Sequence, residues 1–121
     1  MKASLVKITF DPDSLLHCEY FDLPYFDHSW HFHPELELTL ILESEGTRYV
    51  GDHTANFSSG DLVLLGSDLP HLWQNDIGQM DIESKRSRAV VLQFSKDFVG
   101  DFNPYAICFY WPREEYPIQI Q

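Results

Sequence analysis

Basic residues are scarce in this chain of 121 residues, which has 8 Lys and Arg against 19 Asp and Glu. The formal net charge is −11, and protonation of all six histidines would still leave −5. Affinity for nucleic acids depends largely on Lys and Arg side chains that neutralise phosphates. We therefore expect no direct binding of this chain to nucleic acids.

Cysteines and long apolar segments are also few. Cys18 and Cys108 are the two cysteines and form no C-x-x-C motif, which favours reduced thiols in the cytoplasm. The first residues contain no apolar signal-peptide core, and no segment approaches the ~18 apolar residues of a membrane span. The sequence therefore predicts a cytoplasmic protein with no membrane segment.

Short alternating or apolar segments, separated by turn residues, make up most of the chain. Many short strands, with turns every ~8–12 residues and almost no helical periodicity, predict an all-β sandwich or barrel. The expected strands are Leu5–Phe10, His17–Phe21, a long strand within Trp30–Gly46 that bends at Pro34, Thr47–Val50, Thr54–Phe57, Leu62–Leu65, His71–Gln74 and Arg88–Phe94.

The length fits a single domain that spans residues 1–121. The barrel core is expected over about residues 5–95. Ser95 is a good N-cap for a short helix over Lys96–Phe102, and the rest of residues 96–121 is expected to be an irregular tail.

The long strand carries two imidazoles and a carboxylate in the spacing H-x-H-x3-E, at His31, His33 and Glu37. Side chains alternate between the two faces of a strand, so these three residues share one face. Such a group suits a metal ion or a polar ligand.

A competing interpretation comes from the opposite face of the same segment, which carries four leucines (Leu36, Leu38, Leu40 and Leu42). Simple patterning would bury the leucines and leave Glu37 in water. If the face of Glu37 is instead the interior, the leucines need a second layer or another protomer to cover them, and a homodimer is expected.

A second informative segment is Gly60–Asn75, GDLVLLGSDLPHLWQN, which places Pro70-His71 four residues before Asn75. With the first motif, it resembles the two-motif signature of the cupin superfamily over roughly residues 25–95. The resemblance implies a double-stranded β-helix, or jelly-roll barrel, with its site inside. The implied ligand set is His31, His33, Glu37 and His71, which suits Zn, Ni, Fe or Mn. Trp30 and Trp73 flank the histidines as expected apolar walls of the pocket.

The phrases HFHPELELTLILESEGTRYVGDH and AVVLQFSKDF resemble one cupin branch in particular, the N-terminal sensory domain of AraC-type transcription regulators. That resemblance implies binding of a small polar effector in the barrel, with frequent dimerisation. The helix-turn-helix part of such a regulator is absent from this sequence. An excised domain, a truncated gene and a stand-alone domain remain alternatives.

Some turn residues depart from the cupin pattern. Ser44 and Ser59 occupy positions where a glycine and a proline are usual, and Gly66 and Asp68 replace a proline and a glycine before His71. These departures leave the expected fold unchanged but favour sensing over catalysis. The alternative function is that of a stand-alone metal-dependent cupin enzyme, a dioxygenase or an isomerase.

Overall fold

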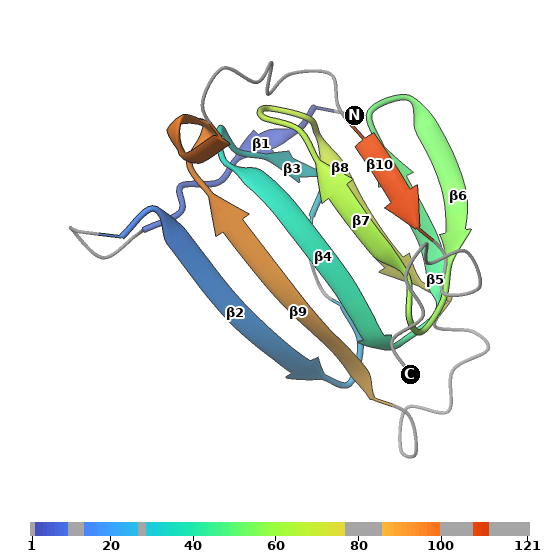
Figure 1. Cartoon of the computed structure of the whole chain (residues 1–121). Helices are drawn as coiled ribbons and strands as arrows, with labels where there is room; N and C mark the ends of the chain where they lie inside the picture. Colours follow the sequence, from blue (N-terminus) through green and yellow to red (C-terminus); the bar gives the residue numbers. More distant parts are fainter. Residues whose placement is uncertain (1, 10–13, 27–28, 77–85, 100–107, 112–121) are drawn as a thin grey trace.

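The computed structural model describes residues 2–9, 14–26, 29–76, 86–99 and 108–111 (Figure 1). These residues form two five-stranded sheets that lie face to face. The strands are β1 (Ser4–Leu5), β2 (Leu16–Leu23), β3 (His31–Phe32), β4 (Leu36–Glu43), β5 (Gly46–Val50), β6 (His53–Phe57), β7 (Leu62–Leu65), β8 (His71–Asn75), β9 (Ser87–Phe94) and β10 (Cys108–Trp111).

One sheet has the strand order β1-β3-β8-β5-β6, and the other has the order β10-β7-β4-β9-β2. Every pairing is antiparallel except that of β1 with β3. Successive strands often lie in different sheets, so the chain winds around a common interior (Figure 1). This architecture confirms the predicted all-β barrel. No helix in the described part of the chain is long and apolar enough to span a membrane.

The ends of the chain differ from the expectation. The first strand is only Ser4–Leu5, although Val6 N still donates a hydrogen bond to Phe32 O (2.9 Å). Ser95 Oγ accepts from Asp97 N (3.2 Å), as expected of a cap, but the helix that follows is a 3-10 helix over Lys96–Val99. Residues 100–107 lie outside the described residues.

The expected irregular tail contains a strand. Cys108–Trp111 pairs antiparallel with β7 along its whole length. Three of its four residues are aromatic, and aromatic residues favour the extended backbone. That composition was the signal for a strand at this position.

Strand β4 decides between the two interpretations of the long strand. Glu37, Thr39 and Ile41 are buried, whereas Leu38, Leu40 and Leu42 are only half-buried. The interpretation that leaves Glu37 in water is therefore wrong. Simple patterning failed because the barrel interior is a partly polar cavity, so the polar residues of β4 face inward together with Ile41. Leu36, at the start of the strand, is the one leucine of the four that is fully buried.

Asn75, at the end of β8, joins four parts of the chain. Its Oδ1 accepts from Phe26 N (2.6 Å) and from Ser87 Oγ (3.4 Å), while its Nδ2 donates to Ser44 Oγ (2.7 Å) and to Glu45 O (2.9 Å). An amide has two donor hydrogens and one acceptor oxygen, so this buried side chain is fully hydrogen-bonded. We call Asn75, Ser44 and Ser87 the Asn75 cluster.

The Asn75 cluster also explains the serine at position 44, where the cupin pattern has glycine. Ser44 Oγ accepts from Asn75 and lies 3.0 Å from Ser87 Oγ, so a side chain is useful here. The close approach of strands occurs two residues later, where a Cβ atom on Gly46 would collide with the main chain of Gln74. The glycine requirement thus falls on Gly46.

Candidate metal- and ligand-binding site

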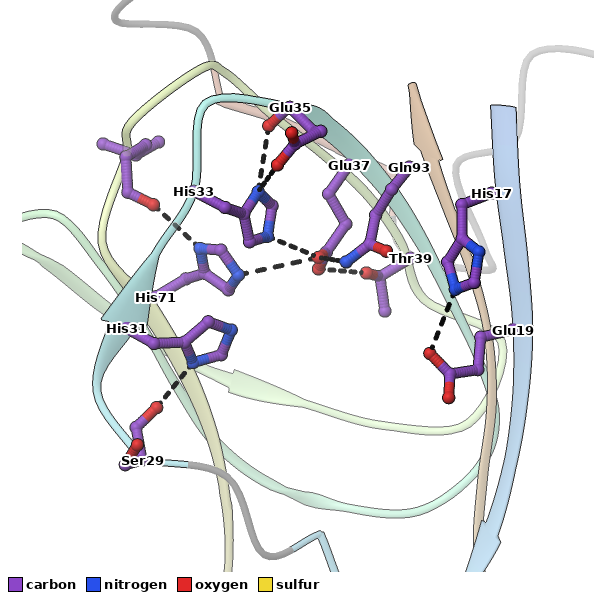
Figure 2. A network of polar contacts seen from close by, with 11 residues as sticks. His17, Glu19, Ser29, His31, His33, Glu35, Glu37, Thr39, His71 and Gln93 are labelled. Atoms are coloured by element: carbon purple, nitrogen blue, oxygen red, sulfur yellow. Dashed lines mark hydrogen bonds and ion pairs between the residues drawn. The ribbon is translucent and has the colours of Figure 1, made fainter. Parts of the chain in front are cut away.

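The candidate site lies between the two sheets (Figure 2). His31 on β3 pairs directly with His71 on β8, and His33 follows β3. Glu37 comes from β4 in the other sheet. Pro34 lies where the chain passes from one sheet to the other, so the H-x-H-x3-E motif spans a sheet crossing and does not lie on one continuous strand.

The three histidines form a close cluster. One ring nitrogen from each of His31, His33 and His71 lies within 4.8 Å of the others. The ring centroids of His31 and His71 are 4.3 Å apart, and those of His33 and His71 are 5.0 Å apart. The expected ligand residues from both motifs therefore converge at one place.

Each histidine directs Nδ1 to a main-chain carbonyl two residues away. The Nδ1–O distances are 2.6 Å from His31 to Ser29, 3.1 Å from His33 to Glu35 and 2.8 Å from His71 to Leu69. Because a carbonyl oxygen can only accept, Nδ1 carries the proton in all three rings. A histidine anchored through Nδ1 is typical of metal-binding sites, and among these three rings the Nε2 atom of His71 is buried without a hydrogen-bond partner.

Glu37 is buried beside the histidines and receives several hydrogen bonds. Thr39 Oγ1 donates to Glu37 Oε2 (2.8 Å), and Gln93 Nε2 donates to Glu37 Oε1 (3.1 Å). His33 Nε2 donates to the same Oε1 at 3.0 Å, and His71 Nε2 lies 3.7 Å from it, too far for a good hydrogen bond. The carboxylate is thus held in place before any ligand arrives.

These contacts set the protonation of the cluster. Burial alone would raise the pKa of Glu37, but its contacts with His33 and His71 outweigh burial and hold that pKa well below its usual value. Burial alone would lower the pKa of His33, but Glu37 raises it overall. Burial and the nearby His71 lower the pKa of His31. These contacts favour the charged forms of His33 and Glu37, whereas its surroundings favour the neutral form of His31.

The donor atoms fit a divalent metal ion. Nε2 of His71 is buried and has no hydrogen-bond partner, and a neutral imidazole offers a lone pair at this position. Three imidazoles with an adjacent carboxylate are a suitable ligand set for Zn, Ni, Fe or Mn. A metal ion would displace the Nε2 proton of His33, so its affinity should fall in acid.

A cavity of about 310 Å³ opens from the histidine cluster into the barrel. Its walls are mostly apolar, and most of its polar groups lie around the histidines, with Glu19 on β2 as the exception. Trp73, which is buried, lines the cavity as expected and contacts the ring of His71, whereas Trp30 is half-buried and is not among the lining residues. The lining residues are Val6, Ile8, Glu19, Phe21, Phe26, His31, His33, Glu37, Thr39, Ile41, His71, Trp73, Ala89, Val91 and Gln93.

Sequence reasoning missed Gln93 and Glu19 as residues of this cavity. Gln93 lies on β9 in phase with Ala89 and Val91, and all three are buried. The sequence places this glutamine on the same face as the apolar residues of the strand, which indicates that it is buried. A buried polar side chain usually has a polar partner, so the position could have been recognised as part of a polar site. Glu19 gave no comparable signal, since its strand is largely exposed.

Comparison with known proteins identifies the fold. No protein-family model and no curated protein matches the chain. Solved structures do match: a cupin 2 conserved barrel domain protein from Rhodopseudomonas palustris has a TM-score of 0.54 at 17% identity, over 72% of this chain and 57% of that chain. A cupin 2 conserved barrel domain protein from Salinispora arenicola CNS-205 has a TM-score of 0.56 at 16% identity, over 76% and 75%.

A third similar structure is unsaturated fatty acid bound ToxT from Vibrio cholerae, with a TM-score of 0.55 at 13% identity over 86% of this chain. The chain spans 57% of the length of the Rhodopseudomonas protein and 43% of the length of ToxT. At these identities the likeness concerns the fold. The chain has the fold of a cupin barrel domain and resembles the corresponding part of ToxT.

Proposed function

We propose that this chain is a small-molecule-sensing cupin domain whose cavity binds an effector beside a divalent metal ion. The observation that carries the proposal is the arrangement of His31, His33 and His71, whose Nδ1 atoms are anchored to carbonyls and whose ligand nitrogens converge at the cavity. A metal ion at this position would supply a localised positive charge that attracts a polar group of the effector. Glu37 would complete the ligand set.

The proposal assigns the domain to an AraC-type regulator, with DNA binding in a separate part of the protein. The two sequence motifs and the likeness to ToxT support this assignment, because that structure holds a small molecule, an unsaturated fatty acid. The net charge of −11 fits a domain that senses and does not itself bind DNA. Effector binding would shift an equilibrium between two states of the regulator. An exposed free thiol at Cys18 fits the reducing cytoplasm.

A homodimer is part of the same proposal. Leu38 and Leu40 pair with Leu92 and Val90 on β9, and all four side chains point away from the barrel interior. A second copy would cover this apolar face. Analytical ultracentrifugation should show a dimer that dissociates on dilution, and a monomer at all concentrations would contradict dimerisation.

A metal-dependent enzyme is the second candidate function. At an Fe, Mn or Ni ion that takes more than four ligands, four protein ligands leave room for water or substrate, and the cavity reaches the histidines directly. A dioxygenase or an isomerase would use this open position. Turnover of a ligand by the metal-loaded protein would favour the enzyme, whereas unchanged recovery of a bound ligand favours sensing.

Metal analysis tests the proposal. Protein purified without chelator and dialysed against Zn, Ni, Fe or Mn should hold about one ion per chain. His71→Ala should lose this ion. The control is His53→Ala, which removes an exposed histidine on β6 and should keep it. Less than ~0.1 ion per chain in the wild type, for every metal, would contradict the proposed metal site.

A further inference from the structure

Polar residues on the inner face of the second sheet continue away from the histidine cluster toward the edge strand β2. Glu37 on β4 pairs with Gln93 on β9, and Gln93 pairs with His17 on β2. The next inward-facing row is Thr39, Val91 and Glu19. Figure 2 shows Gln93 between the histidine cluster and the pair formed by His17 and Glu19. The cavity thus has a polar wall at two places.

Gln93 has an unused acceptor. Its Nε2 donates to the Glu37 carboxylate, which fixes the orientation of the amide because an ionised carboxylate can only accept. The other amide atom, Oε1, is buried and has no hydrogen-bond partner. A buried carbonyl oxygen without a partner costs stability, and a bound donor group would remove that cost.

Glu19 supplies a second acceptor on the same wall. Its side chain is 49% exposed, lines the cavity and lies 3.5 Å from His17 Nε2 through Oε2. Among the described residues, those that line the cavity include no Lys or Arg, so no such side chain lies beside these two acceptors to attract an anionic group. Two acceptors without a lysine or arginine beside them favour a hydrogen-bond donor.

From this geometry we propose that Gln93 and Glu19 form a second subsite, which binds an ammonium or hydroxyl group of the effector. The inference rests on the proposed function, in which the other end of the effector lies at the histidine cluster. Adjacent strands are ~4.8 Å apart, so β2 lies about 10 Å across the sheet from β4. Val91, which lies between Thr39 and Glu19 in the same row, and Ala89 in the next row add apolar surface to this wall. The expected effector is therefore a small elongated molecule with polar groups at both ends.

Three matched carboxylates test this subsite on zinc-loaded protein by calorimetry: 6-aminohexanoate, 6-hydroxyhexanoate and hexanoate. Their carboxylates suit the metal end, and they differ only in the group at the far end. The amino and hydroxy compounds should bind about fivefold more tightly than hexanoate, the gain expected of one added hydrogen bond. A greater gain for the amino compound would identify an ammonium ligand, and a greater gain for the hydroxy compound a neutral one.

Glu19→Gln is the test variant, because it removes the charge and keeps the size of the side chain. It should reduce the preference for 6-aminohexanoate over hexanoate and leave the zinc content unchanged. Glu43→Gln makes the same change at an exposed carboxylate on β4 that pairs with Arg88, and it should keep the preference.

The outcomes separate this inference from the proposed function. Equal binding of the three compounds, binding of none of them, or a full preference in Glu19→Gln would overturn the second subsite while the zinc site stands. A wild-type protein that takes up no metal would overturn the proposed function and the second subsite with it.

Discussion

Two buried polar clusters share the interior of this barrel, and they differ in how completely their hydrogen bonds are made. In the Asn75 cluster, both donor hydrogens and the acceptor oxygen of Asn75 have partners. In the histidine cluster, His71 Nε2 and Gln93 Oε1 are buried without hydrogen-bond partners. Both clusters lie partly on β8, where His71, Trp73 and Asn75 are buried in alternation.

The difference matches the structural role of one cluster and the binding role that we propose for the other. A buried polar group with all its hydrogen bonds stabilises one arrangement of the chain, whereas an unpartnered one costs about 1–3 kcal/mol. Such a cost is acceptable where a ligand later supplies the missing partner. The Asn75 cluster therefore fits a structural role, and the unpartnered atoms of the histidine cluster fit the proposed binding of a metal ion and an effector.

Loss of the Asn75 side chain should have the largest effect on stability. Asn75→Ala removes four hydrogen bonds and strands the buried Phe26 N–H, so the free energy of unfolding should fall by about 3 kcal/mol. Urea denaturation measures this change. Gln74→Ala, at the exposed neighbouring position on β8, is the control and should cost less than ~0.5 kcal/mol. A loss below ~1 kcal/mol for Asn75→Ala would contradict a structural role for the cluster.

The histidine cluster should respond in metal affinity. His71→Ala should lower zinc affinity by at least about a hundredfold, because losing even the hydrogen-bond partners around such ligands costs 10- to 100-fold. Zinc should raise the melting temperature of the wild type, and this rise should disappear in His71→Ala. Competition with a chromophoric chelator measures the affinity. An unchanged affinity would remove His71 from the ligand set.

Within the metal-free histidine cluster, His31 and His33 should titrate in opposite directions from the usual value of 6.5. The pKa of His33 is raised, so its stabilising contribution is complete below pH 6.5 and is lost as the pH rises through the folded-state value. The pKa of His31 is lowered, so protonation of its ring costs stability as the pH falls below 6.5.

Carbon-13 NMR of the two rings measures this separation directly. Glu37→Gln should lower the midpoint of His33, because the carboxylate raises it in the wild type. A midpoint of His33 below that of His31 in the wild-type protein would contradict the buried ion pair with Glu37.

The smallest effect on stability is expected at Gln93. Gln93→Leu loses one hydrogen bond to Glu37 but removes a buried unpartnered oxygen, so the free energy of unfolding should change by less than ~1 kcal/mol. Thermal and urea unfolding of Gln93→Leu should be measured in parallel with Asn75→Ala. The comparison is between loss of an amide that has all its hydrogen bonds and loss of an amide whose oxygen has none. A loss as large as that of Asn75→Ala would show that the two clusters do not differ in the way the hydrogen bonds indicate.

Much of the fold was predictable because it depends on local patterns. Leu62–Leu65 is the strand that its apolar run predicted, and five further strands agree to within two residues. The first strand is shorter than expected, and the long strand is divided at Pro34 between two sheets. The strand at Cys108–Trp111 was missed because proline and charged neighbours in the tail suggested irregular structure. The pairing of that strand with β7 is a long-range contact that no local pattern contains.

The sequence indicated four residues of the candidate site, but it did not indicate the whole arrangement around them. His31, His33, Glu37 and His71 do converge, as the two motifs implied. Gln93 joins them only because β9 pairs with β4 in a register that places it opposite Glu37. The four leucines of β4 suggested that their own face of the strand is the interior. The prediction failed because a local pattern carries no information about a polar cavity.

The sequence by itself determined which side chains are available and where strands can form, because residue type and local alternation are properties of neighbouring positions. Only the tertiary structure decided which face of β4 is the interior and that Asn75 is fully hydrogen-bonded. It also decided that His71 and Gln93 keep unpartnered atoms. The physical reason is that burial and hydrogen-bond partners depend on strand register and on the packing of two sheets, which bring together residues far apart in the chain.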